Sequence, residues 1–186
     1  MDSQPPNFAL RVLVPESTGK TLEAQPTLYW WVSKPMTAKF AFTFGEMPAA
    51  DSFEFSEPLI RTQFQGKNIS GIQALFLKKH NVSLKQGVEY EWSISLVCDP
   101  KNRSLDITAQ GTIMRVAPSA ELASERQRTG EKDLPYFYAK NDLWYDALST
   151  LSNLIQKNPR AKNLRQIRAS LLEQGNLPKV AATEGL

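Results

Sequence analysis

The side chains that could carry acid–base, nucleophilic or metal chemistry are few in this chain of 186 residues, which contains one histidine, His80, and one cysteine, Cys98. A zinc site or a Cys–His pair needs ligands that this composition lacks. Cys98 also follows the apolar parity of a predicted strand, which predicts that it packs as a small hydrophobic side chain. We therefore expect no metal site, no nucleophilic centre and no disulfide within these residues.

Pairs of carboxylates are the remaining candidates for catalysis, namely Glu89 with Glu91 and Asp142 with Asp146. Glu89 and Glu91 fall on the face of their strand opposite Trp92, where solvent would keep them ordinary surface carboxylates rather than general acids. The sequence contains neither a Gly-rich phosphate loop nor a Gly-x-Ser-x-Gly elbow. We expect a protein that is not an enzyme and that uses no cofactor.

Five basic residues follow one another near the C-terminus without an intervening acid: Lys157, Arg160, Lys162, Arg165 and Arg168. Such a run could contact phosphate groups or anionic lipids. The interpretation as a solvated helix face is favoured, because cations stabilise helix ends and no aromatic residue is interleaved for base stacking. The net charge of +3 selects no partner by itself. We expect no nucleic-acid partner and, at most, peripheral membrane contact.

Tyr29, Trp30 and Trp31 form the most unusual local feature, because consecutive residues of a strand face opposite sides. Trp30 shares its side with Leu28 and Val32 and is expected to enter the core. Tyr29 and Trp31 must then either be covered by the C-terminal helices, which is the favoured interpretation, or remain exposed as a platform for a carbohydrate or a protein.

A predicted core strand organises the first part of the chain. Within residues 83–99, one face of this strand carries Tyr90, Trp92, Ile94, Leu96 and Cys98. The segment from Leu84 to Tyr90, with Gly87 at the bend, resembles the tyrosine corner of Greek-key sandwiches, in which the Tyr hydroxyl bonds to upstream backbone.

Short apolar segments separated by turn residues continue through residues 8–116. Pro35 is expected to end one of them, because proline cannot join a strand ladder. Residues 59–65 are more polar and are expected to form an edge strand, which could pair with another subunit. The other predicted strands span residues 8–14, 27–32, 39–44, 72–78, 83–99 and 105–116. About seven short antiparallel strands indicate an immunoglobulin-like or fibronectin type III-like β-sandwich over residues 1–118.

Beyond the predicted sandwich, the apolar residues recur at helical spacing. We predict a helix over residues 119–128, capped by Ser119, and a last helix from about residue 161 to 174. Between them, residues 134–159 resemble one tetratricopeptide repeat, with matching residues at Leu134, Tyr138, Ala147, Leu151 and Pro159. A single repeat cannot bury its own face, so we expect residues 119–186 to form a helical extension that packs on the sandwich or on a partner.

Several longer segments form a combined pattern: Leu13-Val-Pro15, residues 26–32, Tyr90-Glu-Trp92, Cys98-Asp-Pro100, residues 111–116 and Leu143-Trp-Tyr-Asp-Ala-Leu148. Together they resemble a bacterial family of domains of unknown function that is abundant in cyanobacteria. The Cys-Asp-Pro and Trp-Tyr-Asp-Ala-Leu sequences are the most specific parts. Because members of this family usually look exported, the resemblance implies a periplasmic or cell-envelope setting, but it implies no catalytic residue.

The first seven residues contain no signal region, and no apolar run approaches the roughly 18 residues of a membrane-spanning helix. Either the protein stays in the cytoplasm or a leader was removed. With no catalytic constellation, we predict a non-catalytic protein–protein interaction or structural module of a bacterial envelope assembly. The alternative is a β-sandwich that binds a carbohydrate or small ligand through Tyr29 and Trp31.

Overall fold

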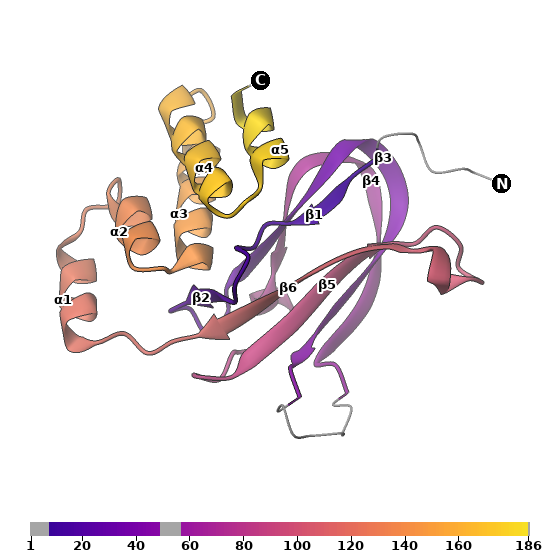
Figure 1. Cartoon of the computed structure of the whole chain (residues 1–186), viewed down its shortest axis with the longest axis horizontal. Helices are drawn as coiled ribbons and strands as arrows, with labels where there is room; N and C mark the ends of the chain where they lie inside the picture. The colour runs from indigo at the N-terminus through magenta and orange to yellow at the C-terminus, as the bar shows by residue number, and fades with distance from the viewer. Residues whose placement is uncertain (1–7, 49–56, 186) are drawn as a thin grey trace.

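The computed structural model describes residues 8–48 and 57–185 (Figure 1). Within these residues, a sheet of six strands is followed by five α-helices. The strands are β1 (Leu10–Val12), β2 (Gly19–Thr21), β3 (Thr27–Glu46), β4 (Ile60–Phe76), β5 (Glu89–Leu96) and β6 (Ile107–Arg115). The helices are α1 (Ala120–Arg128), α2 (Leu134–Lys140), α3 (Trp144–Lys157), α4 (Lys162–Gln174) and α5 (Pro178–Ala181). Three short 3₁₀ turns are η1 (Leu77–His80), η2 (Arg103–Leu105) and η3 (Ala182–Gly185).

The sheet is built around β3, which is 20 residues long. On one side of β3, β4 pairs with it along most of its length. On the other side, β1 pairs with the beginning of β3 and β5 with its end, and β6 and β2 continue the sheet. All of these pairs are antiparallel except that of β2 with β6. The sheet curls into a half-barrel, with the helices beside β1 and β2 (Figure 1).

The prediction of a β-rich chain with C-terminal helices is confirmed, but the strands are not arranged as a two-sheet sandwich. In place of about seven short strands, the described residues form one curled sheet of six strands, two of which are long. The predicted strands 27–32 and 39–44 are parts of β3, and most of 59–65 and 72–78 lies in β4, with residues 77 and 78 in η1. β2 was not predicted, since its pairing with β6 is parallel and distant in sequence.

Local irregularities let each long strand run through residues that normally stop one. Pro35 lies in an exposed part of β3 where the pairing register shifts between Val32 and Ala38, so the missing N–H of proline costs no regular ladder bond. In β4, Asn68 and Gly71 have φ values of 49° and 66°. Glycine adopts this left-handed conformation without strain. The two strands therefore bend together instead of ending.

The tyrosine corner predicted before β5 is confirmed by its hydrogen bond. The Lys85 N–H donates to Tyr90 Oη at 3.0 Å, and Gly87 makes the turn with φ of 74°. Alternate side chains from Tyr90 to Leu96 are buried, as predicted. Cys98 is exposed, which corrects the prediction that it packs in the core. The reason is that β5 ends at Leu96 and the regular alternation of faces ends with it.

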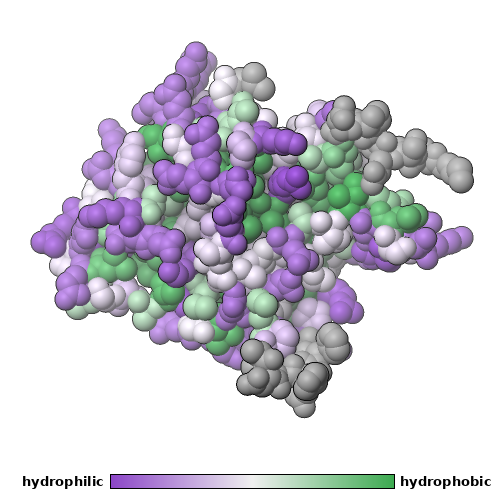
Figure 2. Space-filling view, in the orientation of Figure 1, coloured by the Kyte–Doolittle hydropathy of each residue, from purple (hydrophilic) through white to green (hydrophobic). Residues whose placement is uncertain are grey.

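Aromatic side chains fill the inside of the curled sheet. Phe44 stacks on Tyr90 with ring centroids 5.2 Å apart, and Trp30 packs against Phe40 at 5.0 Å. Burying each such side chain contributes about 1.5–3 kcal/mol to folding. The outer surface of the helices is mostly hydrophilic, and hydrophobic residues reach the surface between the helices and the sheet (Figure 2).

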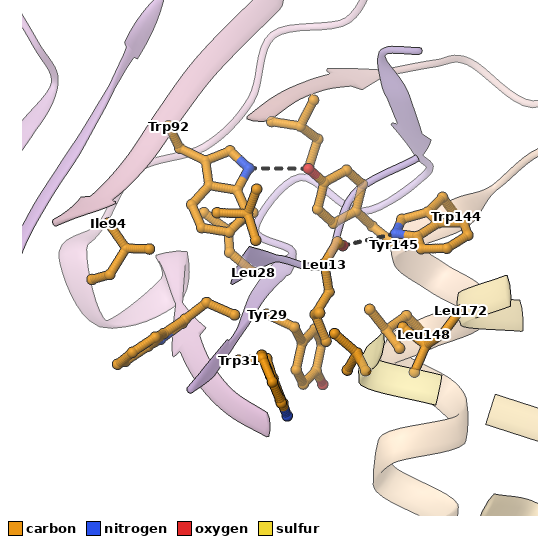
Figure 3. Close-up of a cluster of buried hydrophobic side chains, with 14 of the residues drawn as sticks. Leu13, Leu28, Tyr29, Trp31, Trp92, Ile94, Trp144, Tyr145, Leu148 and Leu172 are labelled. Atoms are coloured by element: carbon orange, nitrogen blue, oxygen red, sulfur yellow. Dashed lines mark hydrogen bonds between the residues drawn. The ribbon is translucent and has the colours of Figure 1, made fainter. Parts of the chain in front are cut away.

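Two adjacent aromatic residues at the start of α3 join the helices to the sheet. Trp144 Nε1 donates to the Leu13 carbonyl at 2.9 Å (Figure 3). Trp92 Nε1 donates to Tyr145 Oη at 3.0 Å, and this hydroxyl donates to the Thr112 carbonyl at 2.9 Å. Burial raises the pKa of Tyr145 above its ordinary value, so the hydroxyl stays a neutral donor. The Trp-Tyr-Asp-Ala-Leu segment is thus a structural joint.

Asp146 is a buried carboxyl group at the same joint. The Leu22 N–H donates to Asp146 Oδ2 at 3.1 Å. Burial raises the pKa of Asp146 from 3.8 to about 6, and hydrogen bonds from the Thr21 side chain and the Leu22 backbone oppose this rise. Asp142 is exposed and binds Lys20 Nζ at 2.6 Å. The two carboxylates therefore have different partners and form no shared acid–base site.

Candidate functional site

Tyr29 and Trp31, the predicted aromatic platform, are both buried. Their exposed fractions are 4% and 6%, and they belong to one hydrophobic cluster with Leu148 of α3 and Leu172 of α4 (Figure 3). The interpretation as an exposed platform is therefore wrong, and the favoured one, coverage by the helices, agrees with this cluster. The carbohydrate hypothesis required exposed rings at Tyr29 and Trp31, and both rings are buried.

A cleft of about 510 Å³ lies where this cover ends, between β4 and the helices. Its sheet side is formed by Tyr29, residues 71–74 and Phe76. Its helix side is formed by Ser152, Asn153 and Gln156 of α3, Arg165 and Arg168 of α4, and Thr183 and Glu184 of η3. Opposite residues in the β3–β4 ladder are Tyr29 with Ala74 and Trp31 with Ile72. Ile72 and Ala74 therefore lie on the side of the sheet that the helices cover over β3.

The outer edge of β4 is not paired with another strand of the described residues. The Leu77 N–H donates to the Pro26 carbonyl at 3.3 Å, so Pro26 and Leu77 are a hydrogen-bonded pair at the end of the antiparallel β3–β4 ladder. Opposite residues alternate between hydrogen-bonded and non-hydrogen-bonded pairs, so Leu75 and every second residue before it bond to β3. The amide and carbonyl groups of Ile72, Ala74 and Phe76 consequently point to the open edge.

Arg168 and Glu184 form a buried ion pair in the helix wall of the cleft. Their exposed fractions are 8% and 6%. Arg168 Nε donates to Glu184 Oε2 at 3.0 Å, and Arg168 Nη2 donates to both carboxylate oxygens at 2.9 and 2.8 Å. Arg168 Nη1 donates to Ser152 Oγ at 3.2 Å. The pair anchors η3 to α3 and α4 and fixes the shape of the wall.

The five predicted basic residues do not form one surface. Arg168 is buried in its ion pair, which is a correction to the predicted basic patch. Lys157 Nζ binds Glu131 Oε1 at 2.5 Å on the exposed surface. Arg160 is exposed in the turn before α4, and Lys162 is exposed at the start of α4. Arg165 lies half-buried at the cleft, where its Nη2 donates to the Pro159 carbonyl at 3.3 Å.

The structure therefore brings together residues from two separate predictions: Tyr29 of the aromatic platform, and Arg165 and Arg168 of the basic run. Glu184 and Ser152 were not predicted, because each lies 16 residues from Arg168 in the sequence and no local pattern connects them to it. The β4 edge was predicted only for residues 59–65, although the edge at the cleft is the later part of the same strand. The predicted edge position of residues 60–65 is confirmed, because β4 pairs only with β3 among the described strands, but the prediction did not extend to the half that lines the cleft.

Other kinds of site find no support in the part of the chain that the structure describes. There, no three His, Cys, Asp or Glu side chains lie close enough together to hold a metal ion. None of the helices in residues 8–48 and 57–185 is long and apolar enough to cross a membrane.

Comparison with protein families agrees with the resemblance noted in the sequence. The model of the family described as Domain of Unknown Function (DUF928) matches residues 1–184. The chain belongs to this family. No curated protein matches the chain. DUF928 membership confirms the family resemblance and assigns no activity, so the function of this DUF928 chain has to be inferred from its geometry.

Proposed function

We propose that this DUF928 chain is a non-catalytic protein–protein interaction module that binds an extended segment of a partner protein as an additional strand on β4. The observation that carries the proposal is the unpaired edge of β4 where it lines the 510 Å³ cleft. In recognition by strand addition, main-chain hydrogen bonds supply affinity, and pockets for alternate side chains supply specificity. The cleft offers both, since residues of α3, α4 and η3 line it together with the open edge of β4.

The composition of the edge supports the same proposal. Natural edge strands are usually protected from association by charged side chains, proline or a covering element. Residues 71–76 read Gly-Ile-Gln-Ala-Leu-Phe and carry none of the protecting residue types. Phe76 is 43% exposed although it is a large apolar side chain. An unprotected edge of this kind allows nonspecific association of an isolated domain, and it also allows a partner strand to pair with the sheet.

The setting that we propose is a bacterial envelope assembly, and its support is the family resemblance of the sequence. A second copy of this chain is a less favoured strand donor, because residues 71–76 contain no charged pair that would set the register of self-pairing. The carbohydrate alternative is not proposed again, because Tyr29 and Trp31 are buried.

The proposal can be tested with the full chain and a phage-displayed library of random peptides of about twelve residues, twice the usual strand length. Selected peptides are synthesised and their affinities measured by calorimetry against wild type, Ala74→Pro and Ala74→Ser. Ala74→Pro removes an amide at the open edge without removing a β3 ladder bond, and an edge strand tolerates proline. Ala74→Ser is the matched control, because it changes the same side chain and keeps the amide.

Peptides that bind wild type and Ala74→Ser but lose about tenfold or more in affinity for Ala74→Pro support strand addition. Backbone amides of Ile72, Ala74 and Phe76 should also gain protection from hydrogen exchange when the peptide binds. Peptides that bind all three proteins equally contradict the proposal. A wild-type dimer that becomes a monomer in Ala74→Pro would identify a second copy as the strand donor and contradict a separate partner.

A further inference from the structure

Arg165 is the charged group in the cleft whose charge is not balanced by a partner. Among the described residues that line the cleft, the charged ones are Arg165, Arg168 and Glu184. The charge of Glu184 is balanced by Arg168, because Arg168 Nη2 donates to both carboxylate oxygens of Glu184. Arg165 forms no ion pair within the described residues, and its one hydrogen bond goes to the Pro159 carbonyl. The cleft therefore carries one net positive charge.

The surroundings of Arg165 restrict the chemistry of its ligand. Asn153 and Gln156 of α3 line the same wall and can donate or accept hydrogen bonds but carry no charge. The opposite side is the small, uncharged surface of β4 around Ala74. A single guanidinium with its planar fork matches the one charge and two oxygens of a carboxylate. A phosphate dianion would keep about one uncompensated charge here.

We propose that the strand entering the cleft presents a carboxylate to Arg165. This inference rests on the proposed function and specifies the chemistry of its partner: an extended peptide in which one acidic group lies opposite the helix wall. An Asp or Glu side chain and the carboxylate at the end of a chain share this chemistry. In an extended strand, alternate side chains point to one side, so one position in the bound segment reaches the wall at Arg165.

The test uses the peptides selected on the full wild-type chain. Sequences that depend on the edge, as judged with Ala74→Pro, are expected to share Asp or Glu at one position or to require the free C-terminus. For the best peptide, the acid is changed to its amide, and separately the C-terminus is amidated. Whichever change removes a contact with Arg165 should weaken binding about tenfold.

The same peptides are measured against Arg165→Gln and against Lys179→Gln as a matched control. Lys179 is an exposed residue of α5 outside the cleft, and its replacement alters the net charge equally. Arg165→Gln should lose the tenfold preference for acid over amide, while Lys179→Gln keeps it. Arg165→Glu should reverse the preference toward peptides with Lys or Arg at that position.

The outcomes separate this inference from the proposed function. Peptides that need the β4 edge but bind equally well as acid and amide contradict the carboxylate inference alone. Equal weakening of acid and amide peptides by Arg165→Gln also contradicts it, since the arginine would then act on the wall and not on the ligand. Peptides that ignore Ala74→Pro contradict strand addition itself, and the carboxylate inference with it.

Discussion

The neighbouring strands β3 and β4 differ in how the helices cover the same side of the sheet: the helices bury it on β3 and leave it open on β4. On β3, Tyr29 and Trp31 are buried in a cluster with residues of α3 and α4, and only Tyr29 also reaches the cleft. Directly opposite on β4, Ile72 and Ala74 line an open cleft. Ile72 and Ala74 are smaller than the aromatic residues that they face, and Phe76 farther along β4 is 43% exposed. The position of the candidate site is therefore determined by where the helical layer ends.

The two regions also differ in what an altered side chain should cost. A sealed aromatic residue loses its hydrophobic burial and leaves a cavity when it is truncated. A residue of the open strand β4 that lines the cleft remains partly exposed to water in the folded state. Its truncation should change folding little and binding more.

The largest effect is expected from Tyr145→Ala at the sealed joint. Tyr145 is 1% exposed and its hydroxyl connects Trp92 to the Thr112 carbonyl, so truncation should lower the free energy of unfolding by about 4 kcal/mol. Phe76→Ala on the open strand is the comparison and should cost less than about 1 kcal/mol. Urea denaturation of both variants measures the difference. Equal losses would mean that the β4 side is as tightly packed as the joint.

The second effect is expected from Glu184→Gln in the wall of the cleft. This change leaves the buried Arg168 guanidinium without its counter-charge and should cost about 3 kcal/mol. Arg165→Gln is the control. Arg165 lies about one turn before Arg168 on α4, and its replacement should cost less than about 0.5 kcal/mol. Denaturant midpoints of the two variants provide the comparison. A small loss in Glu184→Gln would show that the pair is hydrated and does not hold the wall.

The sequence predicted those features of the fold that depend on near neighbours. The Tyr90 hydroxyl and the Lys85 amide are five residues apart, and Ser119 Oγ accepts from the Leu122 N–H at 3.1 Å as a predicted cap. The continuation of β3 through Pro35 could not be predicted in the same way. It depends on the irregular pairing with β4, which is a property of the assembled sheet.

The candidate site was predictable in its parts and not in its assembly. Strand alternation predicts that Tyr29 and Trp31 are either covered by helices or exposed as a platform, and the basic run includes Arg165 and Arg168, for which a solvated helix face was the favoured interpretation. Nothing local places Glu184 beside Arg168 or shows where the helices stop over the sheet. These depend on tertiary packing between segments that are distant in sequence, as the joint between Leu13 and Trp144 illustrates.

The third effect concerns pH and the sealed joint. The pKa of Asp146 rises from 3.8 to about 6 on folding, so the folded state binds this proton more tightly than the unfolded state. The resulting stabilisation is complete below about pH 4 and is lost as the pH rises through about 6. The rise from 3.8 to about 6 corresponds to a change on the order of 2–3 kcal/mol.

Asp146→Asn isolates this contribution from those of other carboxylates, including Glu23, whose charge also raises the pKa of Asp146. Asparagine can still accept the hydrogen bond from the Leu22 N–H through its carbonyl oxygen. The variant should gain stability relative to wild type as the pH rises from about 4 to about 7. Urea denaturation across this range measures the difference curve. A curve that is flat with pH would show that Asp146 is charged throughout and well solvated.

The smallest effect on stability, and the most direct comparison of the two regions, is expected from Phe76→Trp. The four native tryptophans are all buried, with exposed fractions of 3%, 6%, 1% and 7%, so acrylamide should quench the wild-type fluorescence only slightly. Phe76 is 43% exposed and keeps Lys79 Nζ 5.1 Å above its ring, a contact that an indole can also make. The variant should therefore unfold within about 0.5 kcal/mol of wild type and gain a readily quenched component.

A peptide that occupies the cleft should remove this new component. Leu105→Trp supplies the control, because Leu105 is 54% exposed in η2 and does not line the cleft. Its quenched component should remain when the peptide is added. Shielding at position 76 alone locates the peptide on the open strand, whereas shielding at both positions would indicate nonspecific association. Strong quenching of the unaltered chain would contradict the sealed region itself, and with it the contrast between β3 and β4.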